Sequence, residues 1–202
     1  WGTKILSTAT TVAEAQWLED HGADVIIVQG LEAGGHRGHF LNADLTQQSN
    51  MLALVSSIVR AVKLPVIAAG GIIAAKDVAD AMACGAAGVQ IGTAYLLCPE
   101  ADTSPVHRAA LKSTTARQTA LTNLFTGRPA RGIINRLMRD LGAINSAVPD
   151  FPLAASAITP LRARAESLGS GDFSPLWAGT RAAECRELSA AELTRSLGTG
   201  AL

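Results

Sequence analysis

The sequence predicts an α/β fold with a parallel sheet, and three observations lead to that prediction. Short apolar runs rich in β-branched residues alternate with segments of helical periodicity, joined by short connections. The runs are apolar along their whole length, as in strands whose two faces are both covered. Glycines follow three successive runs, at the strand ends where (β/α)8 barrel enzymes place their sites. The glycines therefore favour a barrel over an open doubly wound sheet.

Four βα units can be assigned along the first part of the chain. The expected strands cover residues 4–8, 24–29, 65–69 and 88–91. The first helix is expected to begin at the capping box formed by Thr11 and Glu14, and the later helices to cover 51–62 and 75–84. A complete (β/α)8 barrel has twice as many units, and the chain starts at Trp1 rather than at a methionine. We therefore expect this chain to supply about the C-terminal four βα units of a longer protein.

The second half of the chain shows a different, mostly helical pattern. Ile133, Leu137 and Leu141 form an apolar stripe at helical spacing. Four arginines are expected on the solvent face of a helix: Arg128, Arg131, Arg136 and Arg139. We therefore divide the chain into a half-barrel over 1–104, a small inserted helical domain over 105–160, and helices that return to the barrel over 161–202.

Composition excludes several classes of protein. The 202 residues include 17 basic and 17 acidic side chains, which argues against a protein that binds polyanions, and the 48% of hydrophobic residues excludes a disordered chain. No apolar run reaches the ~18 residues that a membrane span needs, so a cytoplasmic protein is expected. The three cysteines lack CxxC spacing and suggest neither a disulfide framework nor a metal site.

Two glycine turns have the chemistry of a phosphate site. Gly70 and Gly71 follow one expected strand, and Gly92 and Thr93 follow the next. Such turns offer backbone N–H groups with no Cβ in the way, a hydroxyl, and the N-termini of helices. Either pair alone is explained equally well by a tight turn that needs glycine. Two pairs on successive strands favour phosphate binding.

The segment 29–38 contains a histidine among four glycines. His36 has a pKa range suited to proton transfer near neutrality, and the glycines let the backbone approach a flat ligand closely. Arg37 could meet an anionic substrate, although we interpret it as a solvated loop arginine. Gln29 and Gln90 lie on otherwise apolar strands, where a buried amide needs partners that a polar ligand would supply.

Three segments, in this order and spacing, resemble the FMN-dependent nitronate monooxygenase family, formerly called 2-nitropropane dioxygenases. They are QGLEAGGHRG (29–38), PVIAAGGI (65–72) and GVQIGTA (88–94), and the segments 123–137 and 175–179 extend the resemblance over nearly the whole chain. The resemblance implies a TIM barrel with a small helical substrate domain and non-covalently bound FMN. It also implies oxidation of alkyl nitronates by dioxygen to carbonyl compounds and nitrite.

The resemblance also implies roles for individual residues. His36 is similar to the family's catalytic histidine, which would take the α-proton from a neutral nitroalkane or hydrogen-bond the nitro group of a nitronate. The implied cofactor-binding residues are Gln29, Gly34, Gly35, Gly70, Gly71, Gln90, Ile91, Gly92 and Thr93. The implied partners are a small nitro compound and dioxygen, with no nucleic acid and no membrane. The family's site often carries tyrosines, whereas Tyr95 is the only tyrosine here.

Two other functions fit part of the pattern. Barrel-type FMN-dependent enoyl-ACP reductases have a similar EAGGH loop and would reduce an enoyl thioester with NAD(P)H; the Arg37-Gly38 pair and the TGRPARG segment favour the monooxygenase. The other possibility is an inactive flavin-binding fragment. Four parallel strands without closure leave two open edges, so the isolated chain is expected to be poorly soluble or to form an oligomer, for example a homo-oligomer.

Overall fold

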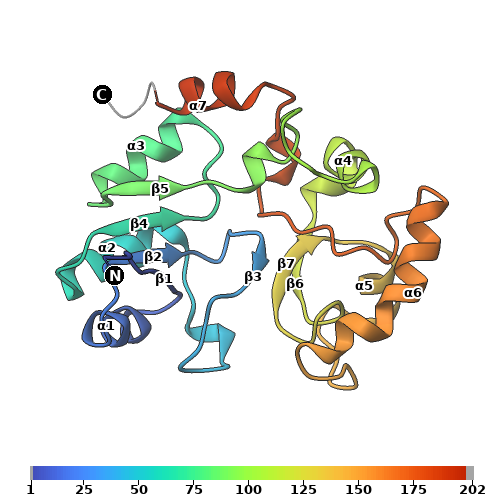
Figure 1. Ribbon diagram of the computed structural model, residues 1–202, viewed down its shortest axis with the longest axis horizontal. Coiled ribbons are helices and arrows are strands. Elements are labelled where there is room, and N and C mark those ends of the chain that lie inside the picture. Colours follow the sequence, from blue (N-terminus) through green and yellow to red (C-terminus); the bar gives the residue numbers. More distant parts are fainter. Residues whose placement is uncertain (1, 199–202) are drawn as a thin grey trace. The chain divides into compact units, whose positions relative to one another are not determined.

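The computed structural model describes residues 2–198 and shows two compact units (Figure 1). Unit 1 is formed by residues 2–33, 38–91 and 191–198, and unit 2 by residues 34–37 and 92–190. The short segment 34–37 therefore belongs to a different unit from the residues on either side of it.

Unit 1 contains the parallel sheet that the sequence predicts. Its strands lie in the order β1-β2-β4-β5, and all neighbouring pairs are parallel. The strands are β1 (Leu6–Ala9), β2 (Val25–Gln29), β4 (Val66–Ala69) and β5 (Gly88–Gln90). The other elements of this unit are α1 (Val12–Asp20), the 3₁₀ helix η1 (Leu45–Gln47), α2 (Met51–Ala61), α3 (Ala75–Ala83) and nearly all of α7 (Ala190–Gly198).

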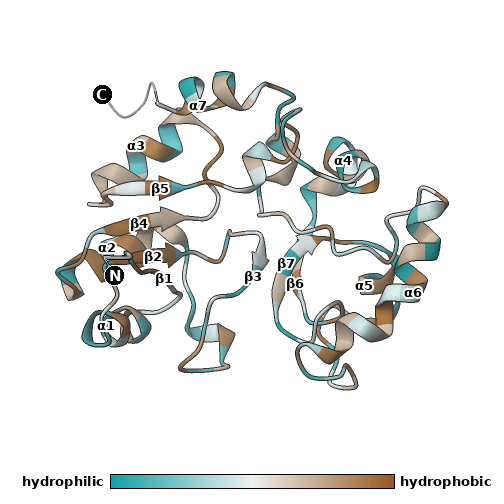
Figure 2. Ribbon diagram, in the orientation of Figure 1, coloured by the Kyte–Doolittle hydropathy of each residue, from teal (hydrophilic) through white to brown (hydrophobic). Residues whose placement is uncertain are grey.

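Apolar packing explains why these segments take their predicted forms. Ile26 and Val28 of β2 are fully buried, as are Val55 and Ile58 on one face of α2, and both elements are strongly hydrophobic in Figure 2. Spacing by three residues puts the two α2 side chains on one side of the helix. α3 ends before Gly85, whose φ of +97° is the left-handed conformation expected after a helix.

A buried carboxylate joins the start of α1 to the segment that precedes η1. Glu14 is 1% exposed, and its carboxylate accepts hydrogen bonds from the Thr10 N–H at 2.7 Å, the Thr10 hydroxyl at 2.7 Å and the Phe40 N–H at 2.7 Å. Gln48 donates to the same hydroxyl at 3.1 Å. The predicted capping box is thus half confirmed, since Thr11 accepts from the Glu14 N–H but Glu14 reaches Thr10 instead of Thr11.

Unit 2 contains a second, antiparallel sheet that the sequence did not predict. Its order is β3-β7-β6, with β3 (Gly35–His36), β6 (Thr119–Thr122) and β7 (Ala130–Ile133). The remaining elements are η2 (Thr93–Tyr95), α4 (Pro105–Lys112), η3 (Thr114–Arg117), α5 (Arg136–Leu141), α6 (Leu153–Ser167) and η4 (Ala182–Glu184).

The helical pattern expected for 105–160 is therefore wrong for residues 119–122 and 130–133, which form β6 and β7. Ile133 ends β7, and α5 starts only after Asn135, whose side chain accepts from the Met138 N–H as an N-cap. Arg131 lies in β7 and Arg128 just before it, so these arginines do not share a helix face with Arg136. Ile133 and Leu137 belong to two different apolar clusters, and Leu141 is exposed, so their helical spacing does not mark one buried helix face.

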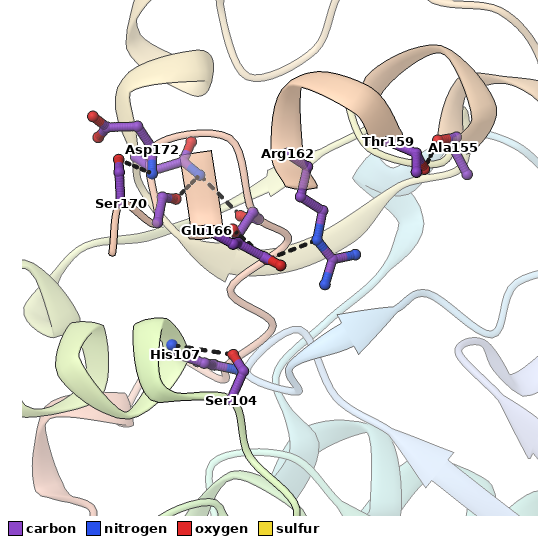
Figure 3. A network of polar contacts seen from close by, with 11 residues as sticks. Ser104, His107, Ala155, Thr159, Arg162, Glu166, Ser170 and Asp172 are labelled. Atoms are coloured by element: carbon purple, nitrogen blue, oxygen red, sulfur yellow. Dashed lines mark hydrogen bonds and ion pairs between the residues drawn. The ribbon is translucent and has the colours of Figure 1, made fainter. Parts of the chain in front are cut away.

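Polar contacts hold α6 against the segment that follows it. Glu166 accepts from Arg162 Nε at 2.8 Å (Figure 3) and from the Ser174 hydroxyl at 2.7 Å. Asn135 donates to the carbonyl oxygens of Gly171 and Ser174 at 3.1 and 2.9 Å. These bonds fix the stretch that leads to Trp177, a side chain that lies beside His36.

Within residues 2–198 no helix combines the length and the apolar character needed to cross a bilayer. The same residues contain no group of three or more histidine, cysteine or acidic side chains arranged to hold a metal ion.

Replacing Glu14 by glutamine tests the buried carboxylate. We expect Glu14→Gln to lower the free energy of unfolding at pH 7 by about 1–3 kcal/mol, because charge-assisted hydrogen bonds become weaker and the amide NH2 group faces other hydrogen-bond donors. Urea unfolding measures the change. Asp20→Asn, an exposed carboxylate on the same helix, is the matched control and should change stability by less than about 0.5 kcal/mol.

The effect of Glu14→Gln should depend on pH in a defined direction. Burial alone would raise the pKa of Glu14, but hydrogen bonds from Phe40 and Thr10 outweigh it and hold that pKa below its ordinary 4.5. A carboxylate with a lowered pKa stabilises the fold above its unfolded pKa, and that contribution is lost as the pH falls through the folded pKa. The difference between wild type and Glu14→Gln should therefore shrink in acid. A constant difference between pH 7 and pH 3 would contradict this account.

Candidate active site

The turn after β4 needs its two glycines for structural reasons. Gly70 and Gly71 have φ angles of +118° and +72°, which side chains rarely adopt. A Cβ at Gly70 would lie 3.0 Å from the Ala33 nitrogen, and one at Gly71 would lie 3.1 Å from Glu32 Cβ. The carboxylate of Glu32 is itself held by the Met51 N–H at 3.0 Å. Backbone conformation and packing thus explain both glycines without a ligand.

The turn after β5 behaves differently. Gly92 has an ordinary φ of −113°, and a Cβ added there would meet nothing within 4 Å. Within residues 2–198 the backbone N–H groups of Gly92 and Thr93 have no acceptor. The Thr93 hydroxyl oxygen accepts from the Gly179 N–H at 3.0 Å, which leaves its own hydrogen to be donated. Local packing does not require glycine here, and the available donors fit a phosphate group.

The two strand glutamines do not occupy equivalent positions. Gln29 is partly buried, and its side-chain oxygen accepts from the Gly38 N–H at 2.8 Å. A Cβ at Gly38 would lie 2.5 Å from Thr8 Cγ2, so this bond holds the chain close against β1. Gln90 is exposed at the end of β5, so the expectation that both amides are buried is wrong for Gln90. Ile91, which follows it, is partly buried.

Glycines 34 and 35 let the segment before His36 fit into unit 2. A Cβ at Gly34 would lie 2.5 Å from both the Ala178 carbonyl carbon and the Gly179 nitrogen. Gly35 has a φ of +75°, a conformation that favours glycine. His36 then pairs with Ala130 in the antiparallel sheet. His36 is thus part of a strand, β3, instead of the open loop that the glycines suggested.

Three side chains that the sequence analysis did not assign surround the imidazole of His36. The Thr126 hydroxyl lies 2.9 Å from His36 Nε2. The rings of Trp177 and Phe151 lie 5.5 and 6.2 Å from the imidazole centroid. Thr126 and Trp177 belong to the segments 123–137 and 175–179, which served only to extend the family resemblance. Their chemical role could not be seen without the long-range pairing.

The surroundings of His36 favour its neutral form. Partial burial lowers the pKa of His36 below its ordinary value of 6.5, and the positive charge of Arg128 lowers it further. A neutral imidazole at neutral pH can accept a proton. The geometry and the charge of its neighbours therefore fit a general base.

Arg37 is buried, with 1% of its surface exposed, so its interpretation as a solvated loop arginine is wrong. Its backbone N–H donates to the Pro129 carbonyl at 2.9 Å. Successive residues of an extended segment point to opposite sides, so the exposed His36 and the buried Arg37 follow from one strand conformation.

Comparison with known proteins decides the family. The family model described as nitronate monooxygenase matches residues 1–200. The chain belongs to the nitronate monooxygenase family. A nitronate monooxygenase of Pseudomonas aeruginosa is 44% identical over 197 residues, which cover 97% of this chain and 56% of the relative. A probable nitronate monooxygenase of Bacillus subtilis is 38% identical over 178 residues, covering 88% of this chain and 51% of the relative.

Solved structures of similar proteins confirm the expected α/β fold of barrel type. A nitroalkane oxidase from Streptomyces ansochromogenes matches with a TM-score of 0.90 at 38% identity, over 98% of this chain and 57% of that one. FabK from Thermotoga maritima matches with a TM-score of 0.78 at 28% identity, over 98% of this chain and 61% of that one. The chain thus spans between one half and two thirds of the length of each of these relatives.

A titration of His36 tests the electrostatics of the site. We expect NMR to show a pKa for His36 below its ordinary 6.5, because burial and Arg128 both disfavour the charged imidazole. Arg128→Gln should move that pKa upward, since it removes one of the two causes. Arg139→Gln, on α5, is the control for a change in net charge and should leave the titration where it was. A His36 pKa above 6.5 in the wild type would contradict this account.

Proposed function

We propose that the protein oxidises alkyl nitronates, and the nitroalkanes from which they form, with dioxygen to carbonyl compounds and nitrite, using FMN. The observation that carries the proposal is His36, whose imidazole lies 2.9 Å from the Thr126 hydroxyl and is flanked by two aromatic rings. It lies in a segment that resembles the catalytic segment of the family to which the chain belongs. The relatives that carry the names nitronate monooxygenase and nitroalkane oxidase support the same reaction.

The residues proposed to hold FMN have distinct kinds of support. The Gly92 N–H, the Thr93 N–H and the Thr93 hydroxyl would donate to the phosphate. The other proposed contacts follow from the family resemblance: Gln29, Gly34, Gly35, Gly70, Gly71, Gln90 and Ile91. When bound, the flavin supplies the redox capacity that amino-acid side chains lack.

His36 would perform the proton chemistry of the reaction. With a neutral nitroalkane, the imidazole accepts the α-proton, the C–H bond breaks, and its electron pair is delocalised onto the nitro group as the nitronate. With a nitronate already formed, the imidazole instead hydrogen-bonds to the nitro group. Trp177 and Phe151 would contact the alkyl part of the substrate beside the imidazole.

The remaining proposals concern the protein's surroundings and organisation. We propose that it acts in the cytoplasm on a small nitro compound and dioxygen, as a homo-oligomer. The division into a half-barrel (1–104), a substrate domain (105–160) and returning helices (161–202) is likewise proposed. Strands β6 and β7 belong to the substrate domain in this division.

Gly92→Ala tests the proposed phosphate contact separately from the fold. The new Cβ meets no atom of the protein within 4 Å, so the free energy of unfolding without FMN should change by less than about 0.5 kcal/mol. A phosphate close to the backbone would meet that Cβ, so the affinity for FMN should fall about tenfold, which corresponds to about 1.4 kcal/mol. Flavin fluorescence titration measures the affinity. Gly198→Ala, also in open space, is the control. Unchanged FMN affinity in Gly92→Ala would refute this contact.

His36→Asn tests the proposed base. Asparagine retains polarity and hydrogen bonding but cannot accept the proton, so kcat/KM for a neutral nitroalkane should fall by about 10²- to 10⁴-fold. The nitronate form of the same compound needs no deprotonation, and its kcat/KM should fall much less. Oxygen uptake measures both reactions. An equal loss with the two substrates would assign His36 a role in binding or structure instead of proton transfer.

A further inference from the structure

The turn that begins η2 is too short to hold its own conformation. Within it, the Tyr95 N–H donates to the Gly92 carbonyl at 2.9 Å and the Leu96 N–H to the Thr93 carbonyl at 3.1 Å. These two bonds only close the helix on itself, and a 3₁₀ helix of three residues has little stability of its own. The conformation of the turn therefore depends on what packs against it.

Two long-range hydrogen bonds join Thr93 to residues 179–185. The Gly179 N–H donates to the Thr93 hydroxyl at 3.0 Å, and the Cys185 thiol donates to the Thr93 carbonyl at 3.1 Å. The direction of the second bond is fixed, because a carbonyl oxygen can only accept. The side chain and the carbonyl of Thr93 are thus both held by one segment, about ninety residues later in the sequence.

The Cys185 thiol keeps its hydrogen at neutral pH. Burial, with the neighbouring Cys98 and Glu184, raises the pKa of that thiol to about 11. Cys185 is a free cysteine, and it packs against the apolar cluster that contains Leu97 and Ala182. A thiol is a weak donor, but this one is always protonated and is held in place by its packing.

The segment that holds Thr93 is itself fixed to the sheet of unit 2. The Ala178 N–H donates to the Arg131 carbonyl of β7 at 3.2 Å, and the Cys185 N–H donates to the Ala182 carbonyl at 3.2 Å. Ala178 and Ala182 are fully buried. β7 also pairs with β3, the strand of His36. One segment thus connects the η2 turn to the strands that place the proposed base.

The turn held in this way presents the donors proposed to bind phosphate. The Gly92 carbonyl and the Thr93 N–H belong to one planar peptide unit, so the bond from Tyr95 to that carbonyl also orients the N–H. The bond from Cys185 fixes the next peptide unit, on the other side of Thr93. The donors of Thr93 therefore keep their directions before a ligand is bound, which lowers the cost of ordering them.

We infer that Cys185 is a positioning residue for the flavin phosphate, acting through the carbonyl of Thr93. The inference rests on the proposed binding of the FMN phosphate at Gly92 and Thr93. Without the thiol, that carbonyl keeps only the bond from Leu96, and the turn gains conformations in which its donors do not converge on one anion. The affinity for a flavin that carries a phosphate should then fall, while the affinity for the rest of the flavin should not.

The test compares Cys185→Ala with Cys185→Ser in the full-length protein. Both variants lose the sulfur and its packing, and only serine keeps a donor. FMN and riboflavin are the probes, since riboflavin is the same flavin without the phosphate. By fluorescence titration, Cys185→Ala should bind FMN roughly 3- to 10-fold more weakly than the wild type, as expected for one lost hydrogen bond, with less than about twofold change for riboflavin. Cys185→Ser should keep most of the affinity for FMN.

Two further variants complete the test. Cys185→Val is a second variant without a donor. Cys185 borders a cavity of about 350 Å³, so the added methyl groups have room, and this variant should repeat the result of Cys185→Ala. Cys84→Ala is the matched control, because Cys84 is a partly buried free cysteine of unit 1. It should leave both affinities unchanged.

Unchanged affinity for FMN in Cys185→Ala and Cys185→Val would overturn the inference. An equal loss for FMN and riboflavin, or an equal loss in Cys185→Ser, would also overturn it, because either would indicate a packing defect. The wild type separates this inference from the proposed phosphate contact: if it binds FMN no more tightly than riboflavin, the contact itself fails, and the inference fails with it. Binding is measured without turnover, so the result does not depend on which reaction the protein catalyses.

Discussion

The antiparallel pairing of β3 with β7 is the constraint on which the candidate catalytic group depends. Two pairs, Gly35 with Arg131 and His36 with Ala130, join a very short strand to a hairpin about ninety residues later in the sequence. The pairing requires a glycine at position 34, where the backbone of Ala178 and Gly179 leaves no room for a Cβ. It brings His36 next to Thr126, and it leaves Arg37 buried. The contacts of the imidazole with Thr126 and Trp177, and the lowered pKa of His36, follow from this placement.

The glycines of the chain fall into two groups with different physical meanings. Gly70 and Gly71 have left-handed backbones and close neighbours, so the fold alone accounts for them. Gly92 has neither, and the N–H groups at Gly92 and Thr93 have no acceptor in the described part of the chain. A glycine that the local structure does not need, next to unused donors, is stronger support for a ligand than a glycine in a strained turn. The phosphate assignment therefore depends mainly on Gly92 and Thr93.

The sequence predicted unit 1 well because local patterns determine it. The continuous apolar run of β2 and the helical spacing of apolar residues in α2 predict these two elements. The Thr11 cap and Gly85 mark the ends of helices. Unit 2 was harder, because β3 has two residues and β6 and β7 have four each. Strands so short carry little periodicity, and their pairing is decided by contacts far apart in the sequence. His36 could be selected from its segment, whereas Thr126 could be recognised only from the folded geometry.

The similarity to both a nitroalkane oxidase and FabK makes the choice of reaction the point to measure first. The decisive experiment supplies the full-length, FMN-loaded protein with an alkyl nitronate and dioxygen, and separately with NADH and an enoyl thioester. We expect oxygen uptake with release of nitrite in the first mixture, and no oxidation of NADH that depends on the thioester in the second. Thioester-dependent oxidation of NADH, with no uptake of oxygen on addition of the nitronate, would contradict the proposed function.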